Sequence, residues 1–177
     1  MKKNRFSLKY LLTPDYMFGS YGDISVEFLL GLGVRALLID IDNTLAPYEQ
    51  AEPDEAIIAW FEELRAAGIS ASLISNNHSQ RVELFNRNLG LDAYPDSHKP
   101  SGKTLLFAMS KMGSDETNTA VIGDQLLTDA LAAHRLGLLA IIVPPIKDKT
   151  SLFFKFKRWL ERPYIRRYKK LQGGDRE

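Results

Sequence analysis

The chain contains no cysteine, and this absence excludes several kinds of site at once. Without thiols there is no disulfide framework, no thiolate zinc site and no cysteine nucleophile. There are only three histidines, His78, His98 and His134, and they form no cluster in the sequence. We expect them to be surface or supporting groups, so a metal site in this chain would have to use oxygen ligands.

Long apolar runs are missing as well. The longest, residues 34–41 and 136–146, are too short to cross a bilayer or are interrupted by Arg35 and Asp40. The basic start of the chain lacks a full hydrophobic region and a small-residue cleavage site, so we expect no signal peptide. These absences predict a cytoplasmic protein.

The net charge of +1 hides a strong asymmetry. Residues 10–150 carry ten basic and nineteen acidic side chains, whereas residues 151–170 carry eight basic side chains and one acidic. The 177 residues, 45% of them apolar, suit one ordinary globular domain. We therefore predict a core domain at 35–150, an N-terminal extension at 1–34 that packs on it, and a basic tail at 151–177.

Short apolar runs alternate with amphipathic runs between residues 34 and 143. The apolar runs predict buried strands at 36–41, 70–74, 93–94, 120–122 and 138–143. Helical spacing predicts helices at 53–67, 79–89, 101–112 (capped by Ser101) and 126–136. This alternation indicates an α/β fold, a doubly wound, Rossmann-like parallel sheet.

Polar residues end or closely follow four of the predicted strands: Asp40 and Asp42, Ser75 to Asn77, Lys99, and Asp124. In doubly wound sheets, ligands bind at the carboxyl ends of the strands, where the topology switches. We therefore expect these side chains to meet in one site suited to an anion.

The two acids at 40 and 42 imply a cation. Their side chains are expected on one face of the chain, because residues two apart on a strand point the same way. Two carboxylates in one pocket repel each other and any phosphate, and Asp124, which follows Gly123, adds a third oxygen ligand. An all-oxygen set favours Mg²⁺ over zinc.

Phosphoryl transfer suits this set of residues. Asp40 can attack phosphorus, and Asp42 can protonate the leaving oxygen and later accept a proton from water. Lys99 and Ser75 can hold the phosphate oxygens, although Lys103 competes with Lys99 for that role.

Four segments resemble the motifs of haloacid dehalogenase (HAD) phosphatases, in the same order: DIDNTL at 40–45, SNN at 75–77, KP at 99–100, and GD at 123–124 with Asp129. The resemblance implies that Asp40 is the nucleophile and a metal ligand, and that Asp42 is the acid/base with its carbonyl on the metal. It further implies that Asp124 binds Mg²⁺ and Asp129 supports it. The phosphate-binding residues implied are Asn43, Ser75, Asn76 and Lys99.

A closer resemblance is to the YqeG-like, phosphatidylglycerophosphate phosphatase branch. It rests on residues 12–15 and 22–24, on DIDNTLAPYE at 40–49 and on GDQLLTD at 123–129. This resemblance implies hydrolysis of phosphatidylglycerophosphate. Another phosphomonoester, a phosphoprotein or a nucleic-acid end remains an alternative substrate.

The motif spacing leaves no room for an inserted cap domain. Only 32 residues separate Asp42 from Ser75, and 23 separate Ser75 from Lys99. One helix and a strand fill most of each interval. A capless site is open, which suits a phosphate carried on a lipid headgroup or another bulky partner.

The tail mixes basic and aromatic residues. Leu152, Phe153, Phe156, Trp159 and Leu160 fall on one helical face, and Pro163 is expected to end that helix. Such a segment is typical of the surface of an anionic membrane, where each basic side chain contributes about 1 kcal/mol. We predict the inner surface of the membrane as partner. The alternatives are packing of the tail on the body and an RNA or ribosome contact, although the chain has no strong nucleic-acid signal.

Overall fold

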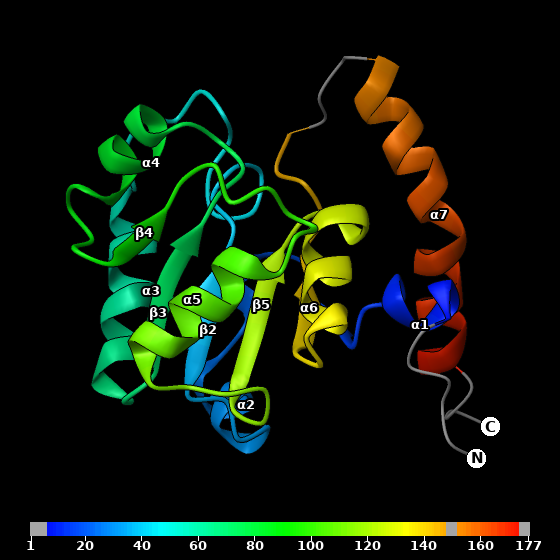
Figure 1. The fold of residues 1–177 in the computed structure, drawn as a ribbon, viewed down its shortest axis with the longest axis horizontal. Helices are drawn as coiled ribbons and strands as arrows, with labels where there is room; N and C mark the ends of the chain where they lie inside the picture. The colour runs from blue at the N-terminus through cyan, green and yellow to red at the C-terminus, as the bar shows by residue number, and fades with distance from the viewer. Residues whose placement is uncertain (1–6, 148–151, 174–177) are drawn as a thin grey trace.

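The computed structural model describes residues 7–147 and 152–173. They form one sheet of six parallel strands in the order β1-β6-β5-β2-β3-β4 (Figure 1). Its strands are β1 (Tyr16–Met17), β2 (Ala36–Ile39), β3 (Ser70–Ile74), β4 (Asp92–Tyr94), β5 (Thr119–Gly123) and β6 (Leu139–Ile142). The predicted doubly wound α/β fold is confirmed.

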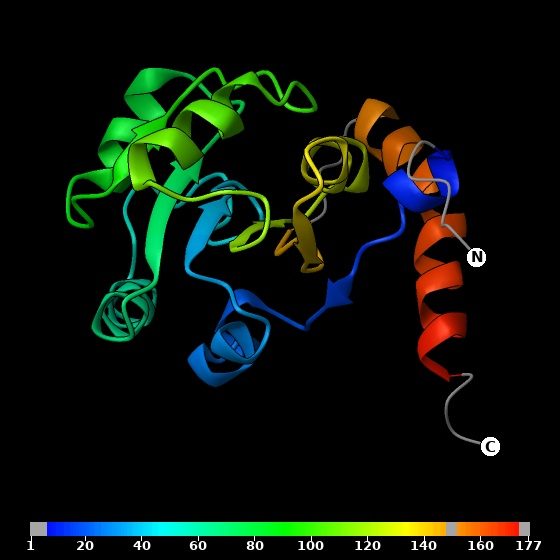
Figure 2. The same ribbon diagram turned by 60° about the horizontal axis from the view of Figure 1, so that its bottom comes forward.

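Helices cover both faces of the sheet (Figure 2). α2 (Val26–Gly31) and α3 (Glu55–Ala66) lie on one face, and α5 (Lys103–Met112) and α6 (Leu131–Arg135) lie on the other. The remaining helices are α1 (Leu8–Leu11), the 3₁₀ turn η1 (Tyr21–Asp23), α4 (Ser79–Asn86), the π-helical turn η2 (Leu126–Ala130) and α7 (Leu152–Gly173). Two apolar cores result, one on each side of the sheet.

Strand β2 shows why the apolar runs become central strands. All four of its residues are buried. Leu37 and Ile39 pack in the core beneath α3, whereas Leu38 packs in the core on the opposite face. A strand that is covered on both faces needs apolar residues at every position, and this is the pattern in the sequence.

No cap domain is inserted, as predicted. Between β2 and β3 the chain forms α3, and between β3 and β5 it forms α4, β4 and α5. Short connections of this kind keep the carboxyl edge of the sheet open. None of the helices in the described ranges is long and apolar enough to span a bilayer.

Three details of the predicted elements are wrong. Gly102 rather than Ser101 is the residue before α5, and the expected helix at 126–136 opens with the π-helical turn η2. Pro163 lies inside α7 and does not end it. Proline removes one helical hydrogen bond, but Tyr164 and Ile165 pack against the core and the Tyr168 hydroxyl oxygen accepts the N–H of Met17, so the helix is held on the body.

The N-terminal segment contributes to the sheet itself. β1 pairs with β6, with Tyr16 opposite Ile141, and Phe28 of α2 packs edge-on against Tyr16. A two-residue strand is too short to show a periodic pattern, so this edge strand was not predicted. The three-segment division of the chain stays a prediction.

Candidate active site

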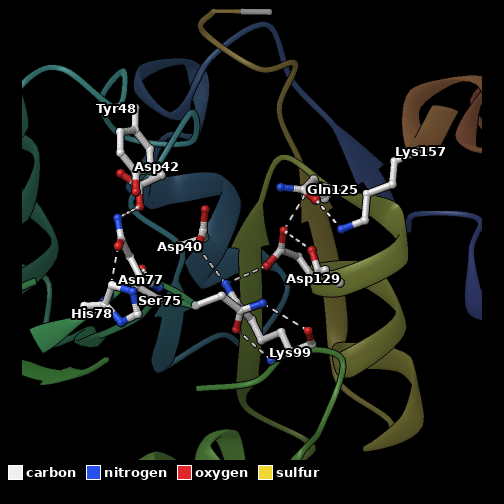
Figure 3. A pocket seen from close by; sticks show the side chains of 12 residues that line it. Asp40, Asp42, Tyr48, Ser75, Asn77, His78, Lys99, Gln125, Asp129 and Lys157 are labelled. Atoms are coloured by element: carbon white, nitrogen blue, oxygen red, sulfur yellow. Dashed lines mark hydrogen bonds and ion pairs between the residues drawn. The ribbon is translucent and has the colours of Figure 1, made fainter. Parts of the chain in front are cut away.

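The predicted site residues meet at the carboxyl edge of the sheet. Strand β2 lies between β3 and β5, so Asp40, Ser75 and Asp124, which follow these three strands, come together at the topological switch point. A cavity of about 330 Å³ opens here. Its lining includes Asp40, Asp42, Ser75, Asn76, Lys99 and Asp129 (Figure 3).

Lys99 is the buried link between the motifs. Its Nζ atom lies 2.7 Å from Asp40 Oδ1 and 2.7 Å from Asp129 Oδ1, and it donates a hydrogen bond to the carbonyl oxygen of Ile74 at 2.8 Å. Burial acts to lower the pKa of Lys99, but Asp129 and Asp40 outweigh it and raise that pKa above its ordinary value. Lys99 therefore stays charged beside the acids. Lys103, the alternative, is exposed on α5.

Asp40, Asp124 and Asp129 form a buried cluster, with one carboxylate oxygen of each lying within 4.8 Å of the others. Burial raises the pKa of Asp40 to about 7, against the lowering effect of Lys99. Burial likewise raises the pKa of Asp124 to about 6, opposed by Arg158. In both groups the effect of burial on the pKa exceeds the opposing effect of the neighbouring cation, so the charged carboxylates are disfavoured in the absence of further positive charge.

The close packing of Asp129 depends on a glycine. A Cβ atom at position 123 would lie 2.3 Å from Cγ of Asp129, so only glycine allows this carboxylate to approach β5. Asp129 Oδ2 accepts hydrogen bonds from the Gln125 N–H and from Thr128 Oγ1, which fix its orientation. Asp129, predicted only to support the metal, thus belongs to the cluster itself.

The Asp42 carboxylate lies apart from that cluster. Its Oδ2 accepts a hydrogen bond from Asn77 Nδ2 at 3.1 Å, and its Oδ1 accepts one from Arg81 Nε at 3.3 Å. The cavity therefore has Asp42 on one side of Asp40 and Asp129 on the other, whereas Asp124 of the cluster is not among its lining residues (Figure 3). The metal contact expected of Asp42 is through its backbone carbonyl rather than this carboxylate, and it stays a prediction.

The other three expected phosphate-binding residues differ in position. Ser75 lines the cavity, and its hydroxyl oxygen accepts the N–H of Asn77. Asn76 also lines it, but its amide bonds to Ser97 Oγ and to both the N–H and the carbonyl of Lys99, so it shapes the Lys99 loop. Asn43 is not among the lining residues. It has φ 66° and accepts the Lys147 N–H, so it holds the 146–147 segment.

The C-terminal helix reaches the same site. Lys157 lines the cavity and donates to Gln125 Oε1 at 3.4 Å, and Arg158 bonds to the side chain and the carbonyl oxygen of Asp124. Neither contact was predicted, nor was that of Arg81. For these contacts the sequence carries one local indication: Arg158 and Glu161 are three residues apart on a helix, a spacing that favours the ion pair they form.

The donor set fits a hard divalent cation. The cluster offers three carboxylates and no nitrogen or sulfur ligand. Asp129 Oδ1 is buried and pairs with the Lys99 ammonium group at 2.7 Å, and a carboxylate oxygen has a second lone pair that a cation can use. Asp40, Asp124 and Asp129 are the residues that would hold the ion.

Comparison with known proteins places this site in a family. The HAD-hydrolase-like family matches residues 97–147. "Probable phosphatase YqeG" of Bacillus subtilis (strain 168) is 35% identical over 155 residues, which cover 88% of this chain and 90% of that protein.

Two solved structures share the fold. A cobalt-bound deoxy-D-mannose-octulosonate 8-phosphate phosphatase from Haemophilus influenzae matches with a TM-score of 0.50 and 15% identity, over 78% of this chain and 91% of its own. An uncharacterized protein from Listeria monocytogenes serotype 4b matches with a TM-score of 0.52 and 15% identity, over 67% of this chain and 85% of its own. With the identity to YqeG over nearly the whole chain, and with the acidic and basic groups of the site in place, this chain belongs to the HAD superfamily of metal-dependent phosphatases, in the YqeG-like family.

Proposed function

We propose that this chain is a Mg²⁺-dependent phosphomonoester hydrolase that passes through an aspartyl-phosphate, and that its substrate is phosphatidylglycerophosphate. The observation that carries the proposal is the position of Asp40. Its carboxylate lines an open cavity together with Lys99 and Asp129, and a second acid, Asp42, lines the same cavity (Figure 3). This arrangement suits attack on a phosphoryl group that enters from outside.

Each chemical step has a residue to perform it. A carboxylate oxygen of Asp40 bonds to phosphorus while the bond from phosphorus to the alcohol oxygen of the substrate breaks, and Asp42 gives that oxygen a proton. Water then attacks phosphorus, Asp42 takes the proton from this water, and inorganic phosphate leaves Asp40. When bound, Mg²⁺ neutralises charge on the phosphoryl oxygens.

The residues around the two acids prepare them for these steps. Asn77 and Arg81 hold the Asp42 carboxylate in place at the wall of the cavity. Lys99 neutralises Asp40 before substrate arrives and lies close enough to contact a phosphoryl oxygen there. Ser75 supplies a hydroxyl group at the cavity wall.

The outer face of α7 supports the lipid assignment. Leu152, Phe156 and Trp159 are 83%, 56% and 59% exposed, and the neighbouring Lys157 lines the cavity. The side chain of Phe153, predicted on the same face, lies outside the described residues. We propose that this face, flanked by basic residues, contacts an anionic membrane and so presents the cavity to a lipid phosphate.

The test is a substrate panel with Mg²⁺. Phosphate release from phosphatidylglycerophosphate in mixed micelles is compared with release from soluble sugar, nucleotide and phosphoprotein substrates, with the Asp40→Asn protein as blank. We expect the lipid to have the highest kcat/KM. Turnover of soluble phosphomonoesters without turnover of the lipid would overturn the substrate assignment and leave the phosphatase chemistry intact.

A further inference from the structure

Arg158, on the C-terminal helix, holds Asp124 at two points. Its Nη2 atom donates to Asp124 Oδ2, and its Nη1 atom donates to the carbonyl oxygen of Asp124 at 2.6 Å. We propose that Arg158 is a positioning residue, which orients Asp124 for the divalent cation and so makes α7 part of the metal site. This inference rests on the metal dependence in the proposed function.

The two-point contact restrains both the backbone and the side chain of Asp124. The Asp124 side chain is fully buried, and Arg158 is its strongest donor, since the Gln125 amide is 3.4 Å from Asp124 Oδ1. A planar guanidinium that bonds to two oxygens leaves little rotational freedom to the carboxylate. The carboxylate oxygen that Arg158 does not hold is thereby fixed in direction.

Glu161 completes the arrangement from the other side of Arg158. Its Oε2 accepts from Arg158 Nη1 at 3.0 Å, and its Oε1 accepts the N–H of Leu127 at 3.1 Å. Leu127 lies in η2, the same turn that carries Asp129. One turn of α7 therefore joins Asp124 to the turn of Asp129 and sets the spacing of two of the three clustered carboxylates.

The charges of this pair nearly cancel. Arg158 is positive and the buried Glu161 is negative, so together they add no net charge to the site. The pair then affects a bound cation mainly through the orientation of Asp124. A variant that removes both charges changes this orientation without changing the net charge of the site. An arginine that merely competed with the cation would give the opposite result, since its loss would strengthen metal binding.

The test measures Mn²⁺ binding to the full chain by electron paramagnetic resonance, without substrate. The variants are Arg158→Gln, the charge-balanced Arg158→Gln/Glu161→Gln, the milder Arg158→Lys, and the control Arg162→Gln, which changes the same charge at an exposed position of α7. We expect the dissociation constant to rise at least fivefold in the first two, to rise less in Arg158→Lys, and to stay unchanged in the control.

A second readout separates positioning from general damage. Circular dichroism should show a folded protein for all four variants. With p-nitrophenyl phosphate, the Mg²⁺ concentration for half-maximal rate should rise in the charge-balanced variant, while the rate at saturating Mg²⁺ recovers most of the wild-type value. Unchanged or tighter Mn²⁺ binding in that variant would overturn the inference, whereas a wild-type chain that binds no Mn²⁺ would contradict the proposed function as well.

Discussion

Lys99 Nζ and Asp40 Oδ1 lie 2.7 Å apart in the buried site, although the two residues are 59 positions apart in the chain. The same ammonium group also lies 2.7 Å from Asp129, so one lysine ties together segments that follow three different strands. The lysine that pairs with the proposed nucleophile therefore also contributes to the stability of the fold.

Loss of the Lys99 charge should destabilise the metal-free protein. Lys99→Ala leaves Asp40 and Asp129 buried without their cation, and removing one partner of a buried ion pair costs about 3–5 kcal/mol. Urea unfolding in EDTA measures the change. Lys103→Ala, at an exposed lysine four residues further on, should change the free energy of unfolding by less than about 0.5 kcal/mol. Similar losses in the two variants would contradict the role assigned to Lys99.

Asp40→Asn should abolish turnover and preserve the fold. The amide is close in size to the carboxylate but does not attack phosphorus, so the rate with p-nitrophenyl phosphate should fall at least about a thousandfold. Asp92→Asn, at the far edge strand, should keep wild-type activity. Retained activity in Asp40→Asn would show that another group attacks.

Asp42→Asn should affect poor leaving groups most. A proton donor matters little when the leaving oxygen is a nitrophenolate, but it contributes about a hundredfold or more when the leaving oxygen is an alkoxide. We expect kcat to fall much further with an alkyl phosphate than with p-nitrophenyl phosphate. Equal losses with both substrates would remove Asp42 from the role of general acid.

The stability of the metal-free protein should carry a pH signature of Asp40. Its pKa rises from 3.8 to about 7 on folding, so the folded state binds a proton that the unfolded state has released. This contribution is complete below about pH 4 and is lost as the pH rises through 7. The melting temperature of metal-stripped wild type, relative to that of Asp40→Asn, should therefore fall between pH 5 and pH 7.5. A difference that is constant with pH would contradict the raised pKa.

Point variants on α7 test the membrane contact better than removal of residues 151–177, because that deletion would also remove Arg158 from Asp124. Phe156→Ser/Trp159→Ser should weaken binding to anionic vesicles at least about tenfold, since two large apolar side chains no longer enter the interface. Hydrolysis of p-nitrophenyl phosphate should be unchanged. Phe107→Ser, an exposed phenylalanine on α5, serves as the matched control and should bind vesicles as wild type does.

Much of the fold follows from local pattern. The run ALLI of β2 and the helical spacing of Ile57, Trp60 and Leu64 in α3 predict these elements, because burial on one or both faces requires a periodic placement of apolar residues. The polar residues after β2, β3 and β5 then predict the site, since parallel strands bring their carboxyl ends to one edge. These features needed no knowledge of long-range contacts.

Other features were decided by tertiary structure alone. Arg81 meets Asp42 across 39 residues, and Arg158 meets Asp124 across 34. The entry of Asp129 into the cluster depends on how closely η2 packs on Gly123. The sequence by itself determined which chemical groups stand at the strand ends, because periodicity and strand order are properties of local segments. Which carboxylates share a cation, and which arginines hold them, depends on distances between elements that no local pattern encodes.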